Sequence, residues 1–314
     1  MKFNTSLLHG GFSPEKGTGA TLTPIYQVSA FAQDSAEQLE KVFNNKAPGF
    51  AYTRISNPTV AAFENRINAL EKGVGAVACS SGMAAVTMSL LNILQQGDEV
   101  IAAAGLFGGT IDLFGDLKAF GIKTRFVEHV TAEEIEPLIN DKTKAVFAEL
   151  IGNPNLEVAD LEEVSALAHS HGVPLIIDAT TATPYLIHPF DFGADIVVHS
   201  SSKYINGGGN SISGIIIDSG SFKWDCERYA GLAEYKKFGK FAYIAKLRNG
   251  IWRNVGGCLA PMNAFMNSVG LETMGLRMER SCSNALALAK FFESCEGIEV
   301  NYPALKSSPF YPLC

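Results

Sequence analysis

The 314-residue sequence lacks the features that mark several common classes of protein. Its apolar runs fall well short of the roughly 20 residues of a membrane helix, and the first residues show no basic segment followed by an apolar one. The formal net charge of −7 gives no electrostatic reason to expect binding to nucleic acid or to anionic lipid. We therefore expect a cytoplasmic protein with no nucleic-acid or membrane partner.

Paired cysteines and dinucleotide-binding motifs are absent as well. The six cysteines are scattered and form no CxxC pair, so neither a metal site nor a disulfide framework is indicated. Reduced thiols are the simplest interpretation, which also fits the cytoplasm. No GxGxxG opens the first predicted strand-to-helix turn, and this argues against a nucleotide-dependent dehydrogenase.

The middle of the chain alternates between strand-like and helix-like patterns. Short runs of apolar, β-branched residues predict strands, whereas apolar residues at helical spacing, as at Val60, Phe63 and Ile67, predict helices. Alternating helices and strands indicate βαβ units, so we expect an α/β fold with a mostly parallel sheet and helices on both faces. The predicted strands are 75–78, 99–104, 123–127, 145–150, 173–178, 194–199 and 214–217.

Changes in pattern give the predicted domain boundaries. Residues 1–55 look irregular, and we expect an arm that lies across a neighbouring surface, such as another subunit. Residues 56–255 form the predicted main domain, although 221–255 have no clear strand period and are interpreted as a loop excursion. Residues 256–314 begin a second lobe, with predicted helices at 261–272 and 280–293 and a strand at 297–300.

The most informative stretch follows the predicted strand 194–199, at Ser200-Ser201-Ser202-Lys203. The carboxyl ends of parallel strands are where α/β proteins bind ligands, and serine hydroxyls suit an anion. A lysine at the edge of an apolar site would lose hydration, which favours the neutral amine that attacks carbonyl groups. Lys203 is therefore a candidate Schiff-base residue, and the alternative is a solvated lysine at the end of a strand.

Three other predicted strand ends carry groups that fit the same ligand. The motif Ser80-Ser81-Gly82-Met83 lies at the start of a predicted helix, whose positive N-terminus suits a phosphate group. The alternative is that a serine of the motif only caps the helix. Asp178 is placed to keep a pyridine nitrogen protonated, or to cap the following loop. Phe107 with Gly108-Gly109 offers an aromatic face, or is an ordinary core residue beside a glycine turn. Together, a phosphate cradle, an aromatic face for a ring, an acid for the ring nitrogen and a Schiff-base lysine describe a binding site for pyridoxal phosphate.

Several motifs occur in an order that one family shares. They are Tyr52-Thr53-Arg54-Ile55-Ser56-Asn57-Pro58-Thr59, Ser80-Ser81-Gly82-Met83-Ala84, Gly152-Asn153-Pro154, Ile177-Asp178-Ala179-Thr180, Ser200-Ser201-Ser202-Lys203-Tyr204-Ile205-Asn206-Gly207 and Gly270-Leu271-Glu272-Thr273-Met274. With them, the chain resembles the cystathionine/methionine-metabolism family of pyridoxal-phosphate enzymes along essentially its whole length. The resemblance implies the fold type I, aspartate-aminotransferase-like fold, with a truncated C-terminal α/β lobe.

The same resemblance implies the roles of individual residues. Lys203 matches the lysine that forms the Schiff base and moves protons, and Asp178 matches the carboxylate paired with the pyridine nitrogen. Tyr52 and Arg54 match phosphate ligands that the family donates from the adjacent subunit, which implies a homo-oligomer, expected as a dimer of dimers. The other residues implied around the cofactor are Ser81, Gly82, Met83, Phe107, Glu149, Asn153, Ser200 and Ser202.

Within the family, the excursion after residue 221 with Ile251-Trp252-Arg253-Asn254-Val255-Gly256 most resembles the O-acetylhomoserine sulfhydrylases. This implies γ-replacement on O-acetyl-L-homoserine with sulfide or a small thiol, giving homocysteine for methionine biosynthesis. The alternatives are a cystathionine γ-synthase, a lyase such as methionine γ-lyase, or a catalytically silent or truncated homologue that binds the cofactor. Methionine γ-lyases carry a cysteine where this chain has Gly109.

Three features depart from the family pattern. Phe107 stands where the family usually has a tyrosine whose ring stacks on the cofactor and whose hydroxyl assists catalysis. Ala179 replaces a common asparagine beside the aspartate. The chain ends at Cys314, before the segment in which the family carries the arginine that binds the substrate carboxylate, so the C-terminal domain is expected to be incomplete.

Overall fold

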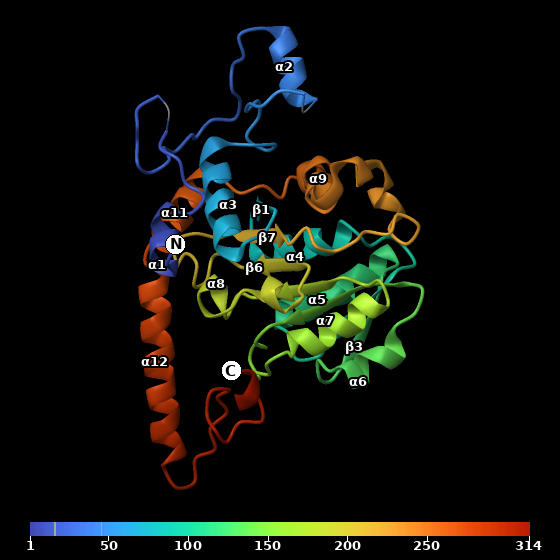
Figure 1. Cartoon of the computed structure of the whole chain (residues 1–314), viewed down its shortest axis with the longest axis vertical. Coiled ribbons are helices and arrows are strands. Elements are labelled where there is room, and N and C mark those ends of the chain that lie inside the picture. The colour runs from blue at the N-terminus through green and yellow to red at the C-terminus, as the bar shows by residue number, and fades with distance from the viewer. Residues whose placement is uncertain (16, 45) are drawn as a thin grey trace.

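The computed structural model describes residues 1–15, 17–44 and 46–314, and in these residues a seven-stranded sheet forms the centre of the molecule (Figure 1). The strand order is β1-β7-β6-β5-β4-β2-β3. Strand β7 runs antiparallel to its neighbours β1 and β6, and the other neighbouring pairs are parallel. The strands are β1 (Gly75–Cys79), β2 (Glu99–Ala103), β3 (Lys123–Val127), β4 (Thr143–Glu149), β5 (Leu175–Asp178), β6 (Ile196–His199) and β7 (Gly214–Asp218).

The central strands are buried on both faces. Every residue of β2, β6 and β7 is buried, and successive side chains of a strand point to opposite faces, so both faces of the sheet are covered. The edge strand β3 is mostly accessible. The predicted strands and the mostly parallel α/β sheet are therefore confirmed. The helices that accompany the sheet are α3 (Pro58–Glu71), α4 (Gly82–Leu91), α5 (Gly108–Leu117), α6 (Ala132–Ile135), α7 (Leu161–Ser170) and α8 (Thr183–Leu186).

Local capping explains where the helices begin. Asn57 caps α3 by accepting a hydrogen bond from the backbone N–H of Thr59 (2.9 Å), and Pro58 occupies the first helical position. Thr131 and Glu134 have the spacing of a capping box at the start of α6, but the box is only half formed. Thr131 accepts from the N–H of Glu134 (3.4 Å), but the Glu134 carboxylate accepts from Glu128 and His129 instead of reaching back to Thr131.

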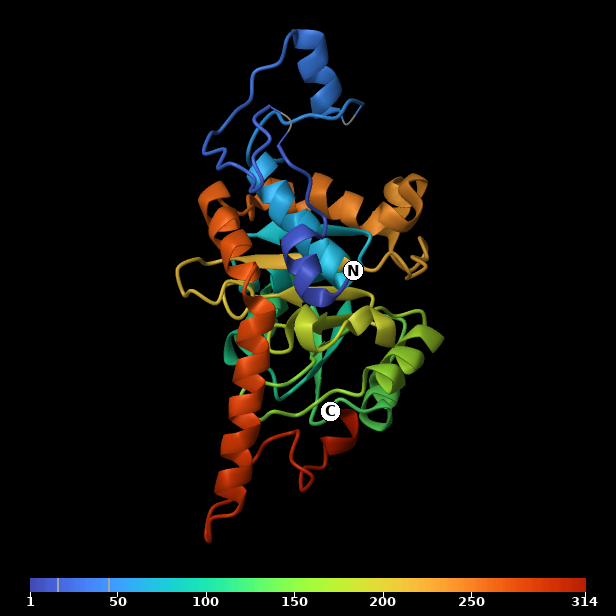
Figure 2. The same cartoon turned by 60° about the vertical axis from the view of Figure 1, so that its left-hand side comes forward.

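The N-terminal region is less irregular than expected. It contains two helices, α1 (Phe3–His9) and α2 (Ala36–Phe43). Helix α1 contacts α3 and α12 and buries Leu7, and its end is held by the side chain of Arg66, which donates to the carbonyl of Leu7. Helix α2 stands well away from the sheet in both views (Figures 1 and 2). A signal for α2 is present in the sequence, because Ser35 caps it by accepting from the N–H of Gln38 (3.2 Å).

The segment predicted as a loop excursion is helical in the structure. It contains the 3₁₀ segment η4 (Ala230–Phe241), then α9 (Ala242–Asn249) and α10 (Ile251–Val255). Two buried aromatic side chains fix it to the sheet domain: the indole N–H of Trp252 donates to the Ala78 carbonyl (2.9 Å), and the Tyr243 hydroxyl donates to the Ser89 carbonyl (2.9 Å). These contacts join residues far apart in sequence, so no local pattern could reveal them.

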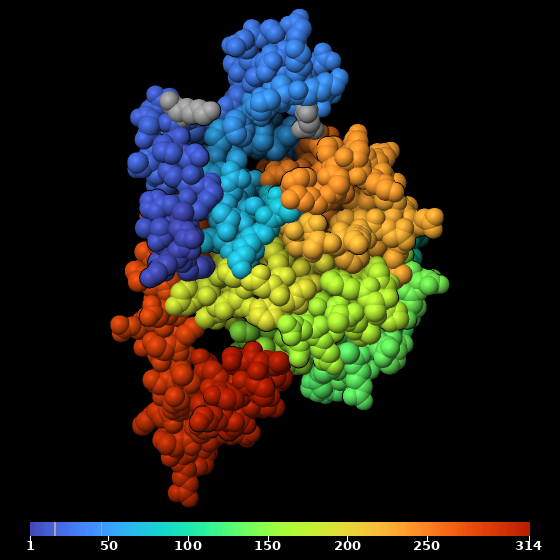
Figure 3. Space-filling view, viewed as in Figure 1, coloured from blue at the N-terminus to red at the C-terminus, as the bar shows by residue number. Residues whose placement is uncertain are grey.

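The C-terminal region consists of α11 (Pro261–Leu271), α12 (Met274–Glu293) and an irregular segment that ends in the short 3₁₀ turn η5 (Tyr311–Leu313). The predicted strand at 297–300 is wrong: these residues form a turn followed by irregular chain. In Figures 1 and 2, α12 extends past the sheet domain, and the last residues return alongside it; Figure 3 shows the same projection in space-filling form. Among the described residues, no helix combines the length and the hydrophobicity needed to cross a bilayer.

Candidate active site

Most of the predicted site residues, though not Tyr52 and Arg54, follow strands that end at one edge of the sheet. The carboxyl ends of β4, β5, β6 and β1 reach this edge together with the amino end of antiparallel β7. Ligands of α/β proteins bind at such edges. The Cα pairs along it are Glu149 with Asp178, Asp178 with Val198, His199 with Ile215, and Cys79 with Gly214.

The amino end of α4 forms a cradle suited to an anion. Ser81 caps the helix by accepting from the N–H of Ala84 (3.0 Å), while the N–H groups of Gly82 and Met83 have no hydrogen-bond partner among the described residues. A Cβ at Gly82 would lie 2.6 Å from the Cβ of Ser200, so only glycine allows the helix to approach the end of β6 this closely. Unpaired amides at a helix N-terminus bind phosphate groups.

Asp178 presents one free carboxylate oxygen at this edge. Its Oδ1 accepts hydrogen bonds from the backbone N–H (2.9 Å) and the hydroxyl (2.5 Å) of Thr180, whereas Oδ2 has no partner among the residues that the structure describes. Burial raises the pKa of Asp178, and the Thr180 hydrogen bonds oppose this shift. A cationic ring nitrogen at Oδ2 would stabilise the carboxylate form, so the site fits a protonated pyridine. The capping interpretation is confirmed for Oδ1, and the pairing of Oδ2 with a ring nitrogen stays a prediction.

Glu149 connects two loops beside Asp178. Its carboxylate accepts from the backbone N–H of Phe107 (2.7 Å) and of Asn153 (2.9 Å). Burial and the nearby charge of Asp178 raise the pKa of Glu149 to about 7, against the opposing hydrogen bonds. The Phe107 ring is 47% exposed, and a Cβ at Gly109 would lie 2.8 Å from it. Phe107 is thus an accessible aromatic face and not a core residue.

Lys203 follows β6 at the same edge, but its side chain is exposed in the single chain. The expectation that an apolar surrounding strips its hydration is therefore wrong for the isolated chain. Ser202 is held differently from what its expected phosphate role requires: its hydroxyl donates to the Ser213 carbonyl (3.0 Å) and accepts from the Ser213 N–H (2.7 Å). This reciprocal pair ties the loop that carries Lys203 to Ser213, a neighbour that the sequence did not reveal.

Tyr52 and Arg54 lie on the segment that precedes α3. The Arg54 guanidinium stacks over the Tyr52 ring, 5.5 Å from its centroid, and donates to the Arg253 carbonyl (2.6 Å). No hydrogen bond or ion pair joins either side chain to the strand-edge groups within residues 1–15, 17–44 and 46–314. Both side chains are exposed. Their role as ligands for a second copy stays a prediction.

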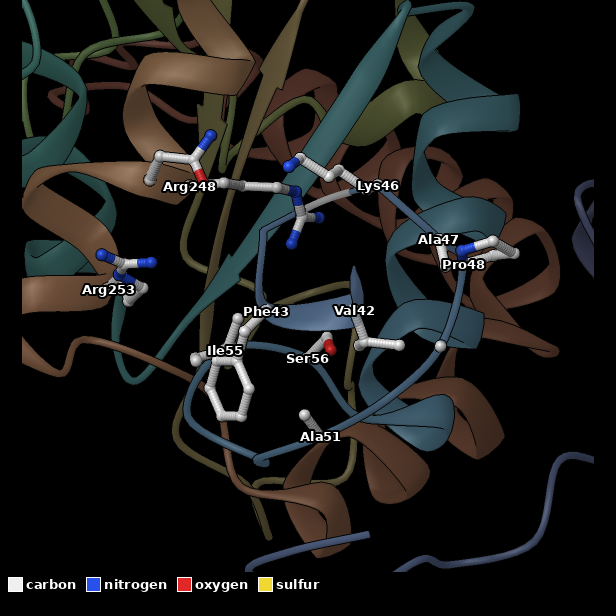
Figure 4. A pocket seen from close by; sticks show the side chains of 12 residues that line it. Val42, Phe43, Lys46, Ala47, Pro48, Ala51, Ile55, Ser56, Arg248 and Arg253 are labelled. Carbon is white, nitrogen blue, oxygen red and sulfur yellow. The ribbon is translucent and has the colours of Figure 1, made fainter. Parts of the chain in front are cut away.

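A cavity of about 420 Å³ lies elsewhere, between α2, the chain before α3, and helices α9 and α10 (Figure 4). Its wall combines apolar side chains with cationic groups, and Figure 4 shows Lys46, Arg248 and Arg253 around one opening. Arg248 is already bonded to Glu64 and to the Ala76 carbonyl (2.6 Å). None of the strand-edge residues lines this cavity.

Fold and site together define an α/β enzyme built to hold an aromatic, phosphorylated carbonyl cofactor. Comparison with known families identifies the family of this enzyme. The chain belongs to the family described as Cys/Met metabolism PLP-dependent enzyme, which it matches over residues 4–314. Its cofactor is pyridoxal phosphate (PLP). The cradle of α4, the free Oδ2 of Asp178 and the accessible Phe107 ring each fit one part of this molecule.

Three known proteins are similar to the chain over nearly its whole length. An O-acetyl-L-homoserine sulfhydrylase from Leptospira meyeri is 41% identical over 331 residues, covering 99% of this chain and 75% of the relative. A homocysteine synthase from Schizosaccharomyces pombe is 40% identical, covering 99% and 76%. The crystal structure of a putative O-acetylhomoserine (thiol)-lyase from Campylobacter jejuni, which carries a pyridoxyl-lysine phosphate, has a TM-score of 0.91 and 33% identity, covering 100% of this chain and 80% of that one.

Proposed function

We propose that this chain catalyses PLP-dependent γ-replacement on O-acetyl-L-homoserine, in which sulfide or a small thiol displaces acetate and yields homocysteine. The observation that carries the proposal is the strand-edge array of Asp178, Glu149 and the α4 amino end, found in a chain about 40% identical to sulfhydrylases acting on this substrate. The expected setting is the cytoplasm.

PLP, when bound, supplies an electron sink for the negative charge that develops at the substrate α-carbon. Asp178 Oδ2 would hold the proton on the ring nitrogen, and the Gly82 and Met83 amides would bind the phosphate, with Ser200 beside them. Phe107 would lie against the ring face. The Lys203 amine would carry the cofactor and, once displaced by the substrate amine, take the proton from Cα.

The arm is proposed to complete the site of a second copy. Tyr52 and Arg54 present a phenol and a guanidinium that are exposed, and among the described residues no hydrogen bond or ion pair joins them to the strand edge of their own chain. Arginine is well suited to phosphate because its planar fork donates two parallel hydrogen bonds. We propose a homodimer as the smallest active unit, paired into a tetramer, with 1–55 as arm, 56–255 as cofactor domain and 256–314 as part of a C-terminal domain.

The test is product analysis with two sulfur donors. Purified protein loaded with PLP and given O-acetyl-L-homoserine should form homocysteine with sulfide faster than it forms cystathionine with cysteine. Preferential formation of cystathionine would instead identify a cystathionine γ-synthase. Release of ammonia and a keto acid without incorporation of sulfide would identify a lyase. Normal cofactor binding with none of these products would identify a catalytically silent homologue, which the absence of a hydroxyl at Phe107 makes worth testing.

A further inference from the structure

A continuous line of contacts leads from the buried interior to Asp178. Glu71 is the last residue of α3 and His199 the last residue of β6; both side chains are fully buried, and Glu71 Oε1 lies 2.6 Å from His199 Nε2. The next residue, Ser200, donates its backbone N–H to Thr180 Oγ1 (2.8 Å). The Thr180 hydroxyl in turn donates to Asp178 Oδ1 (2.5 Å).

The Glu71–His199 pair is costly to bury and so requires an explanation. Burial acts to raise the pKa of Glu71, but the nearby imidazoles of His188 and of His199, which is hydrogen-bonded to it, outweigh burial and hold that pKa below its ordinary value. A charged carboxylate is therefore maintained in the interior, and buried ion pairs are weak contributors to net stability. What this pair does achieve is to fix the orientation of His199, and with it the backbone position of Ser200.

Thr180 is the point where this support meets the carboxylate. Its hydroxyl accepts from Ser200 and donates to Asp178, so both the position and the rotamer of the hydroxyl are determined. Together with its N–H, Thr180 occupies Oδ1 from two directions. This fixes the plane of the carboxylate, and the direction in which Oδ2 points follows from it.

We propose that Thr180, anchored by Ser200 and by the buried Glu71–His199 pair, is a positioning residue that aims Asp178 Oδ2 at the ring nitrogen of the cofactor. The inference rests on the proposed function, because it needs PLP in the strand-edge site. Thr180 touches neither cofactor nor substrate in this assignment. Its effect is confined to the interaction between Asp178 and one ring atom.

The test uses two probes that differ only in that atom: PLP and its 1-deaza analogue, in which C–H replaces the ring nitrogen. The dissociation constant of each is measured with the apo form of the full chain, and their ratio reports the Asp178 interaction alone. Thr180→Val preserves the volume but removes the hydroxyl. Because a hydrogen bond to a charged group contributes about 1.5–3 kcal/mol, the preference for PLP over the analogue should fall roughly 10- to 100-fold.

Thr180→Ser is the matched control, since it keeps the hydroxyl and should keep the preference of the wild type. His199→Phe, if circular dichroism shows a native fold, should also reduce the preference for PLP over the analogue. If this variant does not fold, the two Thr180 variants are sufficient for the test. If Thr180→Val weakened both probes by the same factor, Thr180 would be merely structural and the inference overturned. If the wild type itself bound both probes equally, the proposed pairing of Asp178 with the ring nitrogen would fail, and the inference with it.

Discussion

The strand edge and the N-terminal arm hold their functional groups in opposite ways. At the strand edge, Asp178 and Glu149 are fixed by hydrogen bonds from loops of their own chain before any ligand binds. On the arm, Tyr52 is 40% exposed, and Arg54 is held by little more than the Tyr52 ring and one backbone carbonyl. The difference supports our proposal that one chain positions the groups at the strand edge, and that Tyr52 and Arg54 of a second copy complete the phosphate site.

The largest effect should come from removing the amine at the strand edge. Lys203→Ala should abolish the borohydride-reducible link to PLP and lower turnover by several orders of magnitude, because no other group on this edge is an amine. Mass spectrometry of the reduced wild type should find the cofactor on Lys203. Lys142→Ala, at an exposed turn, is the control and should behave as the wild type. Cofactor on a different lysine would contradict the assignment of the site.

Complementation between two inactive variants should show whether the N-terminal arm completes the site of its own chain or that of a partner chain. Arg54→Ala alone should weaken PLP binding, because a charge-assisted phosphate contact is lost. If the arm serves the partner, mixing Arg54→Ala chains with Lys203→Ala chains should restore up to about a quarter of the sites, since random C2 pairing makes half of the dimers mixed and each mixed dimer has one intact site. Verified mixed oligomers without activity would show that the arm serves its own chain.

The raised pKa of Glu149 should make the free energy of unfolding depend on pH. Its pKa is raised from 4.5 to about 7 in the fold, so the folded state holds the proton more tightly than the unfolded state does. The resulting stability is present below about pH 4.5 and is lost as the pH rises through about 7, a change of about 3 kcal/mol.

Urea unfolding of the apo protein on either side of this window measures the effect. The free energy of unfolding of the wild type should fall relative to that of Glu149→Gln as the pH increases, because glutamine does not titrate. Asp160→Asn, at the partly exposed N-cap of α7, is the control and should follow the wild type. A constant difference between wild type and Glu149→Gln across this range would mean that Glu149 titrates normally.

The sequence predicted the groups at the strand edge far better than it predicted the buried contacts behind them, from Glu71 and His199 to Thr180. The strands and the residues directly after them carry local signals: buried β-branched runs, a serine cap at Ser81 and a carboxylate at Asp178. The support does not, because the contact between Glu71 and His199 joins positions 128 residues apart. Helix α10 was missed for the same reason, since Trp252 is placed by its bond to the Ala78 carbonyl and not by a helical repeat.

The smallest expected effect is that of Phe107→Tyr on kcat, and Phe107 shares one property with each of the two regions compared above. Its backbone is fixed to Glu149 like the rest of the edge, yet its ring is exposed like the arm. A phenyl face stacks on a pyridine ring about as well as a phenol, so Phe107→Tyr should leave PLP affinity nearly unchanged. Only the phenol can transfer a proton, and such assistance typically contributes about 10²–10⁴-fold to a rate. Because acetate leaves without needing much protonation and Lys203 handles the essential proton, we expect kcat for homocysteine formation to rise less than about tenfold, small beside that general-acid range. A rise of a hundredfold or more would identify Phe107 as the mark of an impaired homologue and favour the silent alternative.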